Sequence, residues 1–172
     1  GFSYQGFTQL TGELNSKPPD CLSPAMTGMN IKDHWCSDGG AYWWHNNIAW
    51  GLQIAALKMK RENNIFEWGK IRLALENKSY LREGVGILEK YDPNSFALEW
   101  LKNLNNDCPF EEFKPISTWI KQPMLIIGGL WDPHLKGAFD LYKKSREAGG
   151  NPEILIGNAT HLNWWEGSQE SL

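Results

Sequence analysis

The chain has 172 residues, of which 41% are hydrophobic and 22% are charged, and its formal net charge is −3. This length and composition suit a globular domain that buries its own core. Nucleic acid is excluded as an expected partner, because the sequence has no basic patch to neutralise phosphates. A membrane is excluded as well, since no uninterrupted apolar run approaches the ~18 residues that a membrane span needs.

The three cysteines, Cys21, Cys36 and Cys108, form no Cys-x-x-Cys pair and are an odd number. They therefore fit reduced thiols better than a disulfide framework. Reduced thiols favour the cytoplasm slightly, but the compartment stays open because any signal peptide would precede Gly1. The oligomeric state stays open too.

The first predicted feature is a sharp turn around Ser3, in Gly1-Phe2-Ser3-Tyr4-Gln5-Gly6. Tyr4 to Leu14 is predicted to form the helix that leaves this turn, and Gly1 and Gly6 give the backbone the room that the turn requires. Strand-to-helix turns that expose a nucleophilic serine usually read Gly-x-Ser-x-Gly. Here Gln5 stands where the second Gly is expected, and Gly6 follows one place later.

A turn is predicted at Pro18-Pro19, followed by a short strand from Cys21 to Met26. Pro24 lies inside this strand and lacks the N–H that a central strand donates to its neighbours. We therefore expect the strand to lie away from the centre of a sheet.

Residues 45–115 are predicted to be helical. A first helix has one apolar stripe at helical spacing, formed by Ile48, Leu52, Ala55 and Met59 with Ala49 and Ala56 beside them. A second helix is predicted from Phe66 to Glu76. A third is predicted to start at Asp92-Pro93, a good N-cap and first-turn pair. Its apolar face consists of Ala97, Trp100, Leu101 and Leu104.

The last part of the chain is predicted to form a strand, a helix and a second strand. Met124 to Ile127 is a short apolar run closed by Gly128-Gly129, which is typical of a strand buried on both faces. Lys136 to Ala148 has apolar residues near helical spacing and stops at Gly149-Gly150. Ile154 to Gly157 is the second buried strand. A right-handed crossover makes the strands parallel and puts their carboxyl ends on the same edge of the sheet.

Asp132 follows the first of these strands, and His161 follows the second. The order Ser3, Asp132, His161 is the chain order of the α/β-hydrolase triad. In such a triad the serine attacks an acyl carbonyl, the histidine takes the hydroxyl proton, and the aspartate orients the imidazole. The backbone N–H of Tyr4, the residue after the nucleophile, is the expected oxyanion donor. Asp140 is a spare carboxylate, but it lies inside the predicted helix.

Gly1 to Gln9 resembles the turn at the nucleophile of the cocaine-esterase-like and X-Pro dipeptidyl-peptidase-like hydrolases, which use Gly-x-Ser-Tyr-x-Gly and often continue to Thr-Gln. Further likenesses lie in Asp38-Gly39-Gly40-Ala41, Asp107-Cys108-Pro109-Phe110 and the segment from Pro123 to Pro133. The likeness spans most of the chain. The segment at the histidine departs from that family, which usually reads Ile-Gly-Pro-Trp-x-His. This chain reads Ile-Gly-Asn-Ala-Thr-His, ending at His161.

The resemblance implies an α/β-hydrolase fold, partial because the early strands are missing, with an inserted helical cap. Residues 1–44 would hold the nucleophile and the following sheet segment, residues 45–115 the cap, and residues 116–172 the C-terminal strands and helix with the acid and the histidine. A tyrosine hydroxyl upstream is the second oxyanion donor that the family implies.

The activity implied by the resemblance is that of a cofactor-free serine hydrolase. It would cleave acyl ester or amide bonds, X-Pro dipeptidyl bonds among them, in small molecules or short peptides. The alternative is a catalytically inactive hydrolase fold that serves as a binding or interaction module.

Ten tryptophans are more than ordinary usage, and they require either a large aromatic core or a pocket lined with rings. Trp131 and Trp164 flank the proposed catalytic residues in sequence, so they are the candidates for substrate contact.

The other histidines offer weaker sites. His34, Cys36 and His45 resemble a loose set of metal ligands, but their spacing fits no compact zinc pattern, so we expect no metal. His134 lies close to Asp132 in sequence without a strand to position it, and it is expected at the surface.

Overall fold

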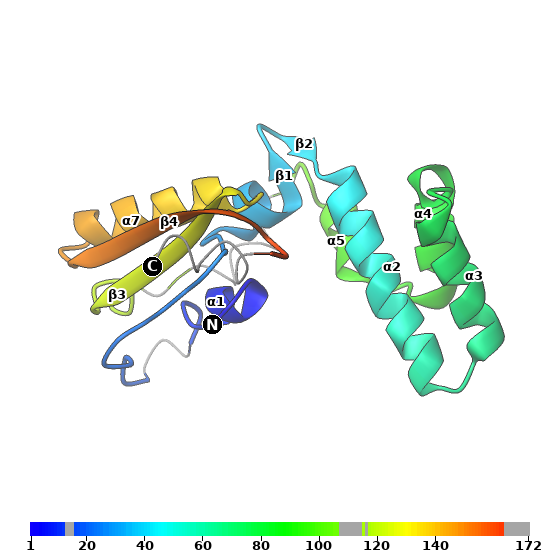
Figure 1. Cartoon of the computed structure of the whole chain (residues 1–172), viewed down its shortest axis with the longest axis horizontal. Coiled ribbons are helices and arrows are strands. Elements are labelled where there is room, and N and C mark those ends of the chain that lie inside the picture. Colours follow the sequence, from blue (N-terminus) through cyan, green and yellow to red (C-terminus); the bar gives the residue numbers. More distant parts are fainter. Residues whose placement is uncertain (13–15, 107–114, 116, 164–172) are drawn as a thin grey trace. The chain divides into compact units, whose positions relative to one another are not determined.

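The computed structural model describes residues 1–12, 16–106, 115 and 117–163. The chain divides into two compact units, of which one comprises residues 1–35 and 110–172 and the other residues 36–109. The first unit contains a parallel sheet, and the second is mainly helical (Figure 1). No helix within the described ranges has the length and apolar character needed to cross a membrane.

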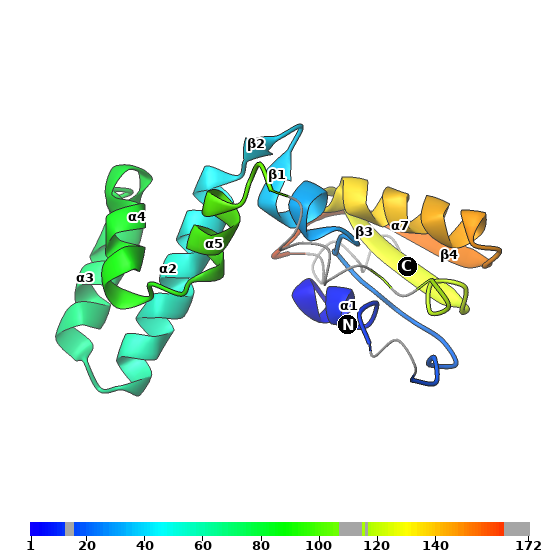
Figure 2. The same ribbon diagram turned by 180° about the vertical axis from the view of Figure 1, so that it is seen from behind.

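The sheet of the first unit is built on a strand-helix-strand unit. β3 (Met124–Trp131) and β4 (Pro152–Thr160) pair in parallel, and α7 (Leu135–Glu147) connects them. α7 lies along one face of the two strands (Figure 2). It ends where expected, because Gly149 has the positive φ of 87° that terminates a helix. The predicted βαβ unit is confirmed, although both strands are longer than the apolar runs that indicated them.

The segment from Leu22 to Ala25 pairs with β3 as well, and it extends the sheet beyond the β3–β4 pair. Parallel bridges join Leu22 to Met124 and Ala25 to Ile127. A further parallel bridge joins Phe2 to Ala25. The segment therefore lies inside the sheet, and the expectation of a position away from its centre is wrong.

Pro24 is tolerated inside the sheet because it removes one bond of the ladder and leaves its neighbours in place. Leu22 N donates to Pro123 O at 2.9 Å. Met26 N donates to Ile127 O at 2.7 Å, and Ile127 N donates to Pro24 O at 3.0 Å. Regular parallel pairing would add a bond from the nitrogen of residue 24, which proline cannot donate. Pro24 is fully buried, so the packing of its ring offsets part of that loss.

The prediction that β3 is buried on both faces is wrong. Met124 and Ile126 are buried in a core cluster with Ala138 and Leu141 of α7. Leu125 points to the opposite face and is 43% exposed. Successive side chains of a strand alternate between its faces, and α7 covers one of them.

The helix after Ser3 is shorter than predicted. α1 spans Tyr4–Thr8, whereas the expected helix reached Leu14, a residue that lies outside the described part of the chain. The chain leaves the helix early because Leu10 turns into the same core cluster as β3 and is fully buried there. A short π-helix, η1 (Lys32–Cys36), lies further along the chain.

Within the described residues, the second unit begins with a hairpin and continues with four helices. β1 (Ser37–Asp38) and β2 (Ala41–Tyr42) pair antiparallel around Gly39-Gly40, whose positive φ values of 56° and 84° suit a two-residue hairpin turn. The helices are α2 (Trp44–Arg61), α3 (Ile65–Glu76), α4 (Tyr80–Tyr91) and α5 (Phe96–Lys102).

The apolar stripe predicted for the first helix is confirmed, and it forms the core of this unit. Ile48, Leu52 and Ala55 of α2 are fully buried, together with Leu88 of α4 and Ala97 of α5. The predicted second helix is confirmed as well, and it starts one residue earlier than expected. The prediction of a helix start at Asp92-Pro93 is wrong. Asp92 is the C-cap of α4, and α5 begins after Ser95.

α4 has no counterpart among the helices predicted from the sequence, because two glycines interrupt its helical pattern. Gly84 lies where α4 crosses α2, and a Cβ atom there would lie 2.4 Å from Ile48 Cγ2. A Cβ atom at Gly86 would have no neighbour within 4 Å. Only the first glycine is therefore required by packing.

This difference predicts opposite effects of two alanine substitutions in α4. Gly84→Ala should lower the free energy of unfolding by about 1–3 kcal/mol, because the added methyl group overpacks the contact with α2. Gly86→Ala should raise it by about 0.5–1 kcal/mol, because alanine is the better helix former and the space is open. Urea unfolding, followed by far-UV circular dichroism, measures both changes in the free energy of unfolding. Equal effects of the two substitutions would contradict the close approach at Gly84.

Candidate active site

Ser3 lies on a strained turn between the sheet and α1. Its φ of 55° is positive, which is uncommon for a residue with a side chain and is typical of strained functional positions. Ser3 N donates to Ala25 O at 2.8 Å, which ties the turn to the neighbouring strand segment. The expected need for glycine is confirmed, because a Cβ atom at Gly6 would lie 2.8 Å from Gly1 O and one at Gly1 would lie 2.6 Å from Gln5 O.

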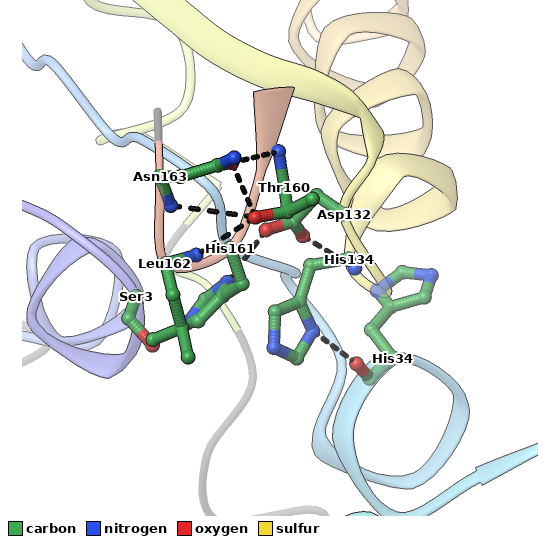
Figure 3. Close-up of polar contacts among 8 residues, drawn as sticks. All are labelled: Ser3, His34, Asp132, His134, Thr160, His161, Leu162 and Asn163. Atoms are coloured by element: carbon green, nitrogen blue, oxygen red, sulfur yellow. Dashed lines mark hydrogen bonds and ion pairs between the residues drawn. The ribbon is translucent and has the colours of Figure 1, made fainter. Parts of the chain in front are cut away.

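The structure brings Ser3, His161 and Asp132 together in one hydrogen-bonded chain (Figure 3). His161 Nε2 lies 2.9 Å from Ser3 Oγ, and His161 Nδ1 lies 2.5 Å from Asp132 Oδ2. A carboxylate only accepts hydrogen bonds, so Nδ1 carries the proton and Nε2 is left to accept the serine hydroxyl. This tautomer is the one that a general base needs.

Asp132 is held by the turn that follows β3. Its side chain is fully buried, and its Oδ1 atom accepts a hydrogen bond of 2.6 Å from His134 N. Asp132 N donates to Gly129 O at 3.1 Å, and Leu135 N donates to Asp132 O at the same distance. Both carboxylate oxygens therefore have a donor, which a buried charge requires.

His161 is held by a compact turn after β4. Thr160 Oγ1 accepts from the backbone N–H groups of Leu162 and Asn163, each at 3.3 Å. The side-chain oxygen of Asn163 accepts in return from Thr160 N at 2.9 Å and from the Thr160 hydroxyl. The ring of Phe2 packs on the imidazole with a centroid distance of 4.9 Å. None of these residues was predicted to support the site.

Tyr4 begins α1, so its backbone N–H belongs to the first turn and has no acceptor within the helix. No residue in the described part of the chain accepts a hydrogen bond from it. The neighbouring N–H groups of Gly6 and Phe7 donate to Ser3 O at 2.8 and 3.2 Å. The Tyr4 N–H is thus a donor beside the serine that remains available to a ligand.

Of the two tryptophans expected near the site, the structure describes Trp131. Trp131 is 70% exposed, and its Nε1 atom donates to Asn158 Oδ1 at 2.8 Å. Trp164 lies outside the described residues.

His134 is buried, and the expectation of a surface position is wrong. The side chain is 3% exposed because the Trp35 ring covers it, with a centroid distance of 4.1 Å. The ring also meets that of His161 edge-on, with a centroid distance of 5.2 Å. His134 Nδ1 lies 2.7 Å from His34 O. Burial lowers the pKa of His134 to about 4, so the ring is neutral at physiological pH.

His34 and His45, which resemble metal ligands in the sequence together with Cys36, have hydrogen-bond partners within the protein. His34 Nδ1 accepts from two backbone N–H groups, and its Nε2 donates to Asp140 Oδ2 at 2.8 Å. Burial is the largest effect on His34 and lowers its pKa. The ring of His45 bonds to the hydroxyl of Tyr80. Asp140, the spare carboxylate, is therefore a partner of His34.

Asp132, His134 and His161 offer ligand atoms that all lie within 4.8 Å of one another. A metal ion could be held by such a group in principle. The 2.5 Å bond between Asp132 and His161 already uses one atom of each, however, and the bond from His161 to Ser3 is the geometry of a triad.

The buried neutral state of His134 predicts a loss of stability in acid. The folded protein binds a proton at His134 less readily than the unfolded chain does, since the pKa falls from 6.5 to about 4 on folding. Its contribution to the free energy of unfolding is therefore complete above about pH 6.5 and decreases as the pH falls toward about 4. Urea unfolding at a series of pH values should show a shallower dependence for His134→Asn than for the natural protein. Identical dependences would contradict a buried neutral ring.

Comparison with known proteins agrees with this geometry. No curated protein matches the chain. The profile of the X-Pro dipeptidyl-peptidase family, S15, matches residues 1–163. That family has an α/β-hydrolase-like fold, and its members are hydrolases that act on small ester or peptide substrates. The resemblance noted in the sequence is confirmed, and the chain belongs to the X-Pro dipeptidyl-peptidase family S15.

Proposed function

We propose that this protein is a serine hydrolase that cleaves acyl ester or amide bonds through an acyl-enzyme formed on Ser3. The observation that supports it best is the continuous hydrogen-bonded chain from Ser3 Oγ through His161 to Asp132. The strained backbone at Ser3 supports the same role, because it exposes a nucleophile at the end of a sheet segment.

In the proposed mechanism His161 Nε2 takes the proton of the Ser3 hydroxyl as Oγ attacks the acyl carbonyl. The imidazolium that forms is stabilised by Asp132, which remains ionised. His161 then gives the proton to the leaving alcohol or amine, which leaves an acyl-enzyme on Ser3. Water attacks this ester in the same way, with His161 as the base, and releases the acid and the free serine. Side chains carry out every proton transfer, so the proposal calls for no cofactor.

The Tyr4 N–H is proposed as one donor to the oxyanion. It stands next to the nucleophile at the N-terminus of α1, where the orphaned N–H groups of a helix favour negative charge. Removal of one such donor typically costs about 10²–10³-fold in rate.

The surface around the triad supports a substrate with apolar groups. Each triad residue has an exposed apolar neighbour in sequence: Tyr4 is 53% exposed, Trp131 70% and Leu162 73%. We propose that Trp131 contacts the substrate. We propose the same for Trp164, because it lies three residues after His161 in the sequence.

The helical unit is proposed to act as the substrate-selecting cap, since the chain inserts it between the serine and the acid. It also offers a half-buried aromatic cluster. The Phe96 ring lies 4.4 Å from that of Trp50 and 4.7 Å from that of Trp100, by centroids.

The test of the proposed mechanism is Ser3→Ala in the full-length protein. We expect it to abolish covalent labelling by a fluorophosphonate and to lower kcat by about 10⁴-fold or more, because the nucleophile is lost. Mass spectrometry of the labelled natural protein should place the adduct on Ser3. An adduct on another residue, or undiminished turnover by the variant, would refute the assignment of the nucleophile.

Two substrates distinguish the proposed bond classes. An aryl ester and a Gly-Pro arylamide should both depend on Ser3, and the ratio of their kcat/KM values identifies the preferred bond. Fast arylamide cleavage would indicate an X-Pro peptidase, and ester turnover alone an esterase. An aromatic ester that binds without turnover would instead favour an inactive binding module.

A further inference from the structure

His134 contacts the proposed triad with both its backbone and its side chain. The backbone N–H donates to Asp132 Oδ1 at 2.6 Å, while the other carboxylate oxygen bonds to His161. The His134 ring packs edge-on against the His161 ring, with centroids 5.2 Å apart. We propose that the His134 ring is a positioning residue for Ser3, His161 and Asp132, an inference that rests on the proposed hydrolase function.

The orientation of the His134 ring is determined by its partners. Its Nδ1 atom lies 2.7 Å from His34 O, and a carbonyl oxygen only accepts, so Nδ1 carries the ring proton. Nε2 of the neutral ring then has the lone pair. Figure 3 shows this nitrogen on the side of the ring toward His161. Trp35 covers the ring at a centroid distance of 4.1 Å.

The carbonyl of His34, which bonds to His134, belongs to a closely packed part of the unit. A Cβ atom at Gly28 would lie 2.3 Å from His34 Cβ, and one at Gly137 would lie 2.5 Å from Gly28 Cα. The backbone segments around His34 are therefore in direct contact. Its ring is bonded on both nitrogens, to backbone N–H groups at one and to Asp140 at the other. This closely packed part extends from α7 to the neighbourhood of His161.

This arrangement affects the charge that His161 gains during the reaction. The negative end of the neutral His134 dipole faces the imidazolium and stabilises it, in a site from which the ring also excludes water. Among the described residues, the titratable groups that face His134 are Asp132 after β3, His161 after β4 and His34 in η1. Asp132 is the one acid among these groups. Because the His134 ring is neutral, it does not compete with protonated His161 for the Asp132 carboxylate.

The experiment compares His134→Phe with the natural full-length protein. Phenylalanine retains the backbone N–H and an aromatic ring but lacks both ring nitrogens. We expect kcat to fall about tenfold with KM within about twofold, because the loss concerns the charged transition state and not substrate binding. The acidic limb of the kcat/KM profile should move about 0.5 pH unit lower, since His161 loses stabilisation of its protonated form.

Two further variants separate positioning from a purely structural role. Ser145→Ala removes another buried side-chain bond to a carbonyl, that of Ser145 Oγ to Ile120 O at 2.6 Å, and should lower stability without moving the pH profile. His134→Asn retains a donor where Nδ1 stood and lacks the ring. It should show the same shift of the acidic limb as His134→Phe, and it serves as the main variant if the phenylalanine protein does not fold.

Unchanged pH profiles in both His134 variants would overturn the positioning role, whatever their stability. Fluorophosphonate labelling of Ser3 in the natural protein makes this failure distinct from failure of the proposed function. Labelling with unchanged profiles refutes the role of His134 alone. Absence of labelling and of turnover in the natural protein refutes the hydrolase mechanism, and the role of His134 with it.

Discussion

The parallel pairing of four chain segments is the constraint on which the first unit depends. Phe2, the segment from Leu22 to Ala25, β3 and β4 all run in the same direction. Their carboxyl ends therefore meet at one edge, and Ser3, His161 and Asp132 follow three of these ends directly. A slip of one residue in the register would turn every side chain of a strand to the other face, so the pairing also determines which groups converge.

Where Ser3, His161 and Asp132 meet, a carboxylate lies out of contact with water. The Asp132 side chain is fully buried, and its two oxygens accept from His161 and from the backbone of His134. Removal of one partner of a buried pair typically costs about 3–5 kcal/mol, because the remaining charge is left uncompensated. The same bonds that keep the carboxylate stable orient His161, so stability and the proposed chemistry depend on one set of contacts. Trp35, which covers His134, completes the enclosure.

Local sequence patterns correctly predicted the helices and strands whose apolar residues follow one periodicity along the whole element. The apolar stripe of α2 is an example, and so is the strand-helix-strand unit of β3, α7 and β4. They failed where a tertiary contact overrides a local preference. Pro24 lies inside the sheet because it costs only one ladder bond, and Gly84 lies inside α4 because Ile48 occupies the space of its Cβ atom. Neither contact can be read from residues near it in the chain.

The sequence by itself determined the order of Ser3, Asp132 and His161 and their positions at the ends of apolar segments, because strand periodicity and the βαβ crossover are local rules. Tertiary structure alone decided the distances among them and the tautomer of His161. It also decided that His134 is buried, since Trp35 and the His34 carbonyl reach it from a distant part of the chain. Burial depends on which segments pack together, and that packing is a property of the whole folded unit.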